Sequence, residues 1–268
     1  MNRVEPLVSV LFLTYERVHL LRRTLESFIQ NTDYPHLELV VTDDGSSAEV
    51  QQDIRTMPFD KVVLAPRNRG TGSNYNAGQR RCSGEYLLFL QDDWECQGPP
   101  GYLRDAVEAM QAHPKIGLVR FYGLDTGVNA VCPIDRECDL LEIQKPERVT
   151  AANRHIYSDT PHLKSRALID ALGEYNEKLP MEQCELEYQD RFLQQDRFCA
   201  AFFPRYMNRL FLHIGQAESF RTNSRHARLE RKLHTLAAPL RERAAPAYKL
   251  LRLGYVRIGR LFVARLPK

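Results

Sequence analysis

Residues 84–94 read GEYLLFLQDDW, an apolar run that ends in two adjacent aspartates. The run Tyr86–Leu90 predicts a buried β-strand, because short apolar runs bounded by polar residues are typical of strands covered on both faces. Asp92 and Asp93 then lie beyond the carboxyl end of that strand, where open α/β sheets bind their ligands. Two carboxylates there suit Mg²⁺ or Mn²⁺, which take few protein oxygens and share substrate phosphates. Taken alone, such a pair is more often a solvated turn.

The residues before this stretch alternate between short apolar runs and helical spacing. Strands are predicted at Val8–Leu13, Leu37–Val41 and Val62–Leu64, and helices at 18–29, 48–57 and 72–82. This order predicts an α/β fold with a doubly wound, mainly parallel sheet. A second acidic pair, Asp43-Asp44, follows the strand at Leu37–Val41.

The residues after this stretch are less regular. Helices are predicted at 102–113, 165–172 and 182–193, and strands at 116–122, 199–203 and 210–213. Residues 123–160 lack clean periodicity, so we expect an irregular, substrate-facing excursion of loops and short strands there.

The composition is that of a globular protein without a membrane span. The chain has 268 residues, 43% of them hydrophobic, which is enough for a large core. It has no apolar stretch of about 20 residues and no secretory signal at its start. Six cysteines lack Cys-x-x-Cys spacing, so neither a zinc site nor a disulfide framework is indicated. A reducing cytoplasm is the expected location.

The charge is unevenly distributed. From Arg221 to Lys268, thirteen Lys or Arg residues stand against two Asp or Glu residues, a net charge of +11, whereas residues 1–220 carry −8. We therefore expect a mildly acidic body at 1–220 followed by a basic helical tail at 221–268.

The tail predicts an amphipathic helix at 247–265. Lys249, Arg252, Arg257 and Arg260 fall on one side and apolar residues largely on the other. This pattern favours an anionic membrane surface, hence a peripheral location on the inner face of the membrane. The alternative is that the apolar side packs on the catalytic domain or on a second subunit. Nucleic-acid binding is a weaker alternative, because no reading motif or aromatic platform accompanies the charge, and we expect no nucleic-acid partner.

Two common nucleotide-binding motifs are absent. Gly70-x-Gly72 follows the third predicted strand, and Tyr75 stands where a dinucleotide-binding fingerprint needs its third glycine. No Gly-x-x-x-x-Gly-Lys-Ser/Thr sequence occurs either. What remains is an acidic, metal-compatible site with carboxylates after two separate strands.

These residues resemble the inverting glycosyltransferases of family 2, which have the GT-A fold. The resemblance rests on VSVLFLTYER (8–17), LELVVTDDGSS (37–47), NRGTGSNYNAG (68–78), GEYLLFLQDDW (84–94) and HIG (213–215), with a looser match at YNEKLPMEQCELEYQDRF (175–192). Together these stretches extend over most of residues 1–220, in the order that the family shows. The resemblance implies a GT-A glycosyltransferase domain at 1–220, with a nucleotide-sugar-binding half at 1–98 and an acceptor-side half at 99–220.

The resemblance implies a nucleotide-sugar site. It implies donor binding by Thr14, Tyr15, Arg17, Asp44, Asn68, Asn76 and Asp92, with the Tyr15 ring on the nucleotide base. It implies that Asp93 and His213 hold Mn²⁺ or Mg²⁺, while Asp92 faces the sugar or ribose. The alternatives are structural: Asp44 as a turn residue, the Asn and Gly residues as turns, and His213 as an ordinary strand end. Trp94 suits either a wall for a sugar ring or the core.

An inverting transfer also needs a base for the acceptor hydroxyl. The ungapped resemblance at 175–192 puts Glu185 at the base position, and Glu182, one helical turn earlier, is the second choice. Cys184 departs from the family pattern, in which an acidic residue stands there. Glu187 and Asp190 are expected to be helix-face charges, one of them paired with Arg191.

We therefore expect a metal-assisted transfer of a sugar from a nucleotide sugar to a saccharide or lipid-linked saccharide. A nucleotidyltransferase is the enzyme alternative, although its glycine-rich loop is absent after the first strand, where Thr14-Tyr15-Glu16-Arg17 stands. A catalytically inactive nucleotide-binding scaffold at the membrane is the other alternative.

Overall fold

The computed structural model describes residues 5–124, 129–134, 139–150, 153 and 155–215. In its first half, strands and helices alternate as predicted: β1 (Val8–Thr14), α1 (Val18–Asn31), β2 (Leu37–Asp43), α2 (Ala48–Arg55), β3 (Lys61–Leu64), α3 (Thr71–Gln79) and β4 (Tyr86–Gln91). The basic tail and its predicted helix at 247–265 lie outside the described residues, and the domain boundary at 220 stays a prediction.

The second half contains mostly shorter strands. Its elements are β5 (Trp94–Cys96), α4 (Tyr102–Ala112), β6 (Ile116–Arg120), β7 (Val131–Pro133), β8 (Leu141–Ile143), β9 (His162–Ser165), α5 (Arg166–Leu172), α6 (Met181–Gln194), β10 (Cys199–Phe202) and β11 (Phe211–His213). The prediction of loops and short strands at 123–160 is confirmed by β7 and β8. Strands β5 and β9 were not predicted.

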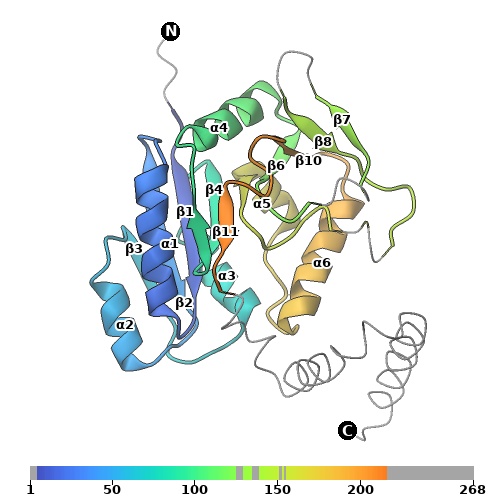
Figure 1. Cartoon of the computed structure of the whole chain (residues 1–268). Helices are drawn as coiled ribbons and strands as arrows, with labels where there is room; N and C mark the ends of the chain where they lie inside the picture. Colours follow the sequence, from blue (N-terminus) through green and yellow to red (C-terminus); the bar gives the residue numbers. More distant parts are fainter. Residues whose placement is uncertain (1–4, 125–128, 135–138, 151–152, 154, 216–268) are drawn as a thin grey trace, which may run out of the picture. The chain divides into compact units, whose positions relative to one another are not determined.

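A nine-stranded sheet has the order β3-β2-β1-β4-β9-β6-β10-β8-β7 (Figure 1). Strands β3, β2, β1 and β4 are parallel, and β6 is parallel to β10. Strand β9 runs antiparallel between β4 and β6, and β8 and β7 add antiparallel partners at one edge. The prediction of a mainly parallel α/β sheet is confirmed.

Helices cover both faces of the sheet because successive strand residues point to opposite sides. In β1, Val10 and Phe12 pack in a cluster with residues of α1, α2 and α4. Leu11 and Leu13 pack in a second cluster with residues of α3, α5 and α6. All four side chains are at most 5% exposed. A strand buried on both faces needs an uninterrupted apolar run, and this is the signal by which the sequence predicted β1 and β4.

Strand β9 was missed because it has no such run. Its sequence is His162-Leu163-Lys164-Ser165, yet His162 and Lys164 have 0% exposed surface. His162 packs against Phe89 with ring centroids 5.2 Å apart. Polar side chains are thus buried against aromatic rings in the middle of the sheet, which no apolar pattern could indicate.

Strand β5 was missed because it is only three residues long. It pairs antiparallel with β11, so that Trp94 lies opposite His213. The Trp94 ring is 4% exposed and belongs to the core. Its centroid lies 4.5 Å from that of Tyr122 and 4.7 Å from that of His213. Of the two interpretations of Trp94, the structure supports core packing.

Candidate active site

The carboxyl ends of β1, β2 and β4 meet at one edge of the sheet. Thr14 is paired with Asp43, and Leu13 with Gln91, the last residue of β4. The backbone N–H of Asp92 donates to Leu13 O at 2.9 Å. The two predicted acidic pairs therefore lie beyond neighbouring strands, at the edge where α/β sheets bind their ligands.

Asp92 and Asp93 form the turn between β4 and β5, and both are buried, at 0% and 4% exposure. Asp92 accepts a hydrogen bond from Thr14 Oγ1 at 2.8 Å, and Arg17 donates to it through two nitrogens. Burial raises the pKa of Asp92 to about 7, although the Arg17 guanidinium lowers it, and the charge of Asp93 adds to the rise. The pair is therefore a buried site and not a solvated turn.

Asp93 joins three segments of the chain. Its Oδ2 lies 2.9 Å from Arg17 Nη1 and 3.3 Å from His213 Nε2, and its backbone oxygen accepts from Ile214 N at 2.9 Å. Burial opposes ionisation of Asp93, but the His213 contact and the Arg17 charge outweigh it and hold its pKa below the ordinary value. A Cβ on Gly215 would collide with the Asp93 carboxylate, so this backbone approach needs glycine.

The side-chain atoms of Asp93 and His213 fit a hard divalent cation. Asp93 Oδ1 is buried and has no hydrogen-bond partner in the described part of the chain, and the His213 imidazole lies beside the same carboxylate. Mg²⁺ and Mn²⁺ accept one or two protein ligands when substrate phosphates complete the shell. Within the described ranges no group of three or more His, Cys, Asp or Glu side chains could hold a metal. Substrate phosphates and water usually complete the coordination of such an ion.

The second acidic pair is engaged with backbone groups. Asp43 closes the turn after β2, where Ser46 N and Gly45 N donate to its carboxylate at 2.9 and 3.1 Å. The two oxygens of Asp44 accept from Arg69 N at 2.8 Å and Gly70 N at 2.9 Å. Asp44 thus fixes the loop that begins α3. Its predicted contact with the base or ribose stays a prediction.

The predicted donor-binding residues differ in their burial and in their hydrogen bonds within the protein. Asn68 is exposed, and Tyr15 and Arg17 are half-buried. Asn76 is 1% exposed, and its side chain donates to Tyr175 O and accepts from Tyr175 N, both at 2.9 Å. The structure therefore has Asn76 joining α3 to the segment before α6, while its role in donor binding stays a prediction.

Helix α6 presents the two predicted base candidates. Glu182 is exposed, whereas Glu185 is half-buried and its Oε1 accepts from Ser158 Oγ and Asp159 N, both at 3.0 Å. Cys184 is 2% exposed, and its sulfur would lie 2.8 Å from a Cβ added to Gly72. This packing of α6 on α3 gives a physical reason for a small apolar residue at 184.

The other charges of α6 behave as expected. Arg191 Nη2 lies 2.9 Å from Glu187 Oε2, one helical turn away, which confirms the predicted pairing. Sequence reasoning did not single out residues 155–161, which supply both hydrogen bonds to Glu185 Oε1. No motif or periodicity in the sequence distinguishes it from the irregular residues before it.

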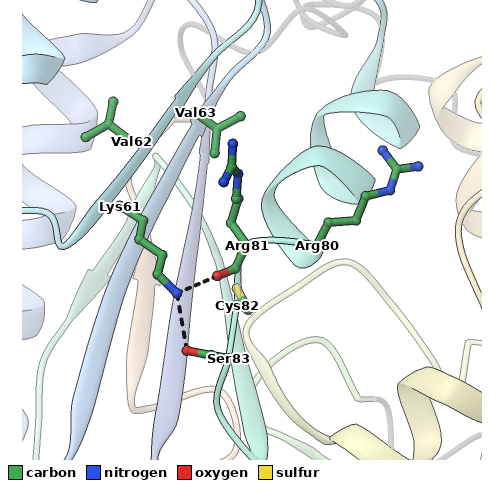
Figure 2. A pocket seen from close by; sticks show the side chains of 7 residues that line it. All are labelled: Lys61, Val62, Val63, Arg80, Arg81, Cys82 and Ser83. Atoms are coloured by element: carbon green, nitrogen blue, oxygen red, sulfur yellow. Dashed lines mark hydrogen bonds between the residues drawn. The ribbon is translucent and has the colours of Figure 1, made fainter.

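A pocket of about 500 Å³ lies elsewhere, between the start of β3 and the end of α3 (Figure 2). Lys61, Arg80 and Arg81 line it, but Lys61 Nζ is 2.5 Å from Glu38 Oε1 and Arg80 Nε donates to Glu174 at 2.6 Å. The pocket is at the amino ends of β3 and β4, opposite the acidic pair. We therefore do not assign it to the donor.

The family model described as "Glycosyl transferase family 2" matches residues 9–173. The chain belongs to this family of glycosyltransferases, which favours sugar transfer over the nucleotidyltransferase alternative. A GalNAc(5)-diNAcBac-PP-undecaprenol beta-1,3-glucosyltransferase of Campylobacter jejuni is 36% identical over 95 residues, 34% of this chain and 30% of that protein. GlyA of Streptococcus pneumoniae is 25% identical over 217 residues, 77% of this chain and 30% of that protein. The matches thus span about a third of these relatives.

Solved structures with the same fold include two ligand complexes. A mannosyltransferase of Pyrobaculum calidifontis, PcManGT, with GDP-Man and Mn²⁺ has a TM-score of 0.56 at 19% identity, over 82% of this chain and 60% of that one. A fragment of S. aureus TarS with UDP has a TM-score of 0.55 at 20% identity, over 73% and 60%. At such identities the likeness shows the fold alone, which is the predicted GT-A fold.

Proposed function

We propose that the chain transfers a sugar from a nucleotide-sugar donor to a hydroxyl acceptor, with inversion at the anomeric carbon and with the help of Mn²⁺ or Mg²⁺. The observation that supports it best is the buried Asp93, which has one oxygen without a partner in the described part of the chain and His213 beside the other. A site for one cation beside a second acid, Asp92, suits a diphosphate that must be held and released.

Asp93 and His213 would hold the metal, which stabilises the negative charge on the departing diphosphate when it is bound. The Arg17 guanidinium contacts both aspartates. It is also a positively charged group that would reach the phosphates of a bound nucleotide sugar. Thr14 fixes one oxygen of Asp92, and Asp92 faces the sugar or ribose. Tyr15, Asp44, Asn68 and Asn76 complete the proposed donor site.

Glu185 is the proposed base, with Glu182 as the second choice. The Glu185 carboxylate takes the proton of the acceptor hydroxyl while the hydroxyl oxygen forms a bond to the anomeric carbon. The bond from this carbon to the diphosphate oxygen breaks with its electron pair on the diphosphate. Two hydrogen bonds, from Ser158 Oγ and Asp159 N, already orient Glu185 Oε1. General-base catalysis requires a carboxylate positioned in this way.

The first test is a search for the donor. Full-length protein is heated with UDP, GDP, UDP-glucose, UDP-N-acetylglucosamine and GDP-mannose, each with and without Mn²⁺. A ligand present at 100 times its dissociation constant stabilises the fold by about 2.7 kcal/mol, or roughly 5–10 °C in melting temperature. A Mn²⁺-dependent rise with a nucleotide is the expected result. If binding occurs without turnover for any acceptor, the inactive-scaffold alternative is favoured.

The proposed acceptor is a saccharide or lipid-linked saccharide. The Campylobacter jejuni relative is named for an undecaprenol-linked substrate, and an enzyme acting on such a molecule benefits from contact with the bilayer. Among the described residues, no helix is both long and apolar enough to cross a membrane. We propose that contact rests on the positive charge of the basic tail, as a peripheral attachment to the cytoplasmic face.

Deleting residues 245–268 is expected to release the protein from anionic liposomes. Each cation near such a surface contributes about 1 kcal/mol, so loss of several cations should abolish sedimentation with phosphatidylserine vesicles. Full-length protein on uncharged phosphatidylcholine vesicles is the control. Equal retention of the two forms on anionic vesicles would contradict the membrane proposal.

A further inference from the structure

Residues 155–161 run from the irregular segment into β9 and are held by a buried arginine. Arg120, at the end of β6, has 0% exposed surface. One of its nitrogens donates to His155 O at 2.5 Å and Ile156 O at 3.1 Å, and another to Tyr122 O at 2.7 Å. The segment therefore has a fixed starting point at the carboxyl edge of the sheet.

Lys164, on β9, is fully buried and is surrounded by aromatic rings. Its ammonium lies 4.7–5.9 Å from the ring centroids of Tyr75, Tyr157, Tyr175 and Tyr188. Their four rings are at most 3% exposed. Cation–π contacts of this kind partly replace water around an ammonium group, but burial still lowers the pKa of Lys164 to about 7.

Asp159 lies at the other end of a short chain of hydroxyl groups. Lys164 Nζ donates to Tyr157 Oη at 3.4 Å, and Tyr157 and Tyr175 donate to Asp159 Oδ1 at 3.2 and 2.6 Å. Burial, with the nearby charge of Glu185, raises the pKa of Asp159 to about 7. The four side chains thus link one buried cation to one carboxylate, and they are neutral as a set whether the proton lies on Lys164 or on Asp159.

This set is connected to the proposed base through the backbone. The N–H of Asp159 and the hydroxyl of Ser158 both donate to Glu185 Oε1. The side chain of Asp159 points to the tyrosines while its N–H holds Glu185. Whatever fixes Asp159 therefore also fixes the carboxylate of Glu185.

We propose that Lys164, Tyr157, Tyr175 and Asp159 form a charge-balanced anchor that positions Glu185 as the base, so that Asp159 and Lys164 are positioning residues for the transfer reaction. The proposal rests on the proposed function only for the role of Glu185. The anchor can be tested by stability and hydrogen-exchange measurements that need no substrate.

The first test is a double-mutant cycle on thermal stability at pH 7.5. Asp159→Asn leaves the buried Lys164 without its counterpart, and Lys164→Met does the same to the partly buried Asp159. Each change is expected to lower the melting temperature by about 6 °C or more. The double variant removes both groups and should lose clearly less than the sum of the two single losses. Additive losses would overturn the charge-balanced anchor. Asp170→Asn, at an exposed position of α5, is the matched control and should change nothing.

The second test measures whether the anchor holds the Glu185 contact. Hydrogen–deuterium exchange of full-length protein is followed in peptides that contain residues 155–161. Loss of the bond between Glu185 and Asp159 N is worth about a ten-fold faster exchange, and Glu185→Ala sets this reference. Lys164→Met should show the same acceleration, and the double variant should reverse most of it. Unchanged exchange in Lys164→Met would overturn the proposal.

The third test separates positioning from general loss of structure. Release of nucleoside diphosphate from UDP-glucose, UDP-N-acetylglucosamine or GDP-mannose is measured with Mn²⁺, with water as the acceptor. Asp159→Asn should lower kcat about 10–100-fold and leave the donor KM within about two-fold, because the base and not the donor site is displaced. A change confined to KM would overturn the positioning role. If Glu185→Gln leaves kcat intact, the proposed base is wrong, whereas the exchange result still decides on the anchor.

Discussion

Glu185→Gln is expected to leave donor binding intact and to reduce sugar transfer about 10²–10⁴-fold, which is the contribution of a general base. Glutamine keeps the size of the side chain and an oxygen that can accept from Ser158 and Asp159, so the packing of α6 should persist. Only the ability to take a proton is lost. Transfer is measured as release of nucleoside diphosphate, and donor binding by calorimetry.

The comparison with Glu182→Gln decides the register of α6. Glu182 is exposed, and its change should leave kcat within about two-fold, as expected for a surface side chain. If Glu182→Gln alone stopped transfer, the ungapped match at 175–192 would be wrong by one helical turn. Similar losses in both variants would indicate that neither acid acts alone as the base.

Asp93→Asn is expected to abolish the part of nucleotide binding that depends on Mn²⁺. The amide keeps the shape of the carboxylate but not its charge, and the charge is what attracts the metal. A metal bridge to a diphosphate is worth several kcal/mol, so the affinity for UDP or GDP in the presence of Mn²⁺ should fall about 100-fold. Calorimetry with and without Mn²⁺ measures this difference.

The result expected without metal provides the internal control. Weak nucleotide binding in EDTA should be the same for Asp93→Asn and the unaltered protein within about three-fold. The proposed contacts to the nucleobase and to the ribose do not involve Asp93 and therefore remain. Asp170→Asn controls for loss of a carboxylate elsewhere. Unchanged affinity of Asp93→Asn with Mn²⁺ would remove Asp93 from the metal site.

The parts of the fold that could be predicted are those with a periodic signal. Strands β1 and β4 are buried on both faces and therefore have apolar runs, and α1 shows the spacing of one buried face. Strand β9 is buried as well, but by aromatic rings around Lys164 and His162. Such burial depends on rings from α3, β4, α6 and the loops before β9 and α6, so the local sequence holds no sign of it.

The candidate site likewise contains residues that the sequence predicted and contacts that it could not predict. Asp92, Asp93 and His213 were named from motifs, and the pairing of β5 with β11 brings the histidine to the aspartate. Motifs do not indicate which internal partners a side chain has. Arg17 contacts both acids of the turn, and Asn76 contacts the backbone of Tyr175, and both facts depend on tertiary geometry that a linear match cannot contain.

The position of β9 has a consequence for the order in which the protein can be made. On the ribosome, β4 emerges long before His162–Ser165, its neighbour on one side in the finished sheet. Until then one long edge of β4 lacks its backbone partner, and an unpaired apolar edge invites association with other chains. A shortened chain of residues 1–98 would keep that edge permanently. We therefore expect that residues 1–98, the proposed nucleotide-binding half, cannot cover this edge of β4 without His162–Ser165.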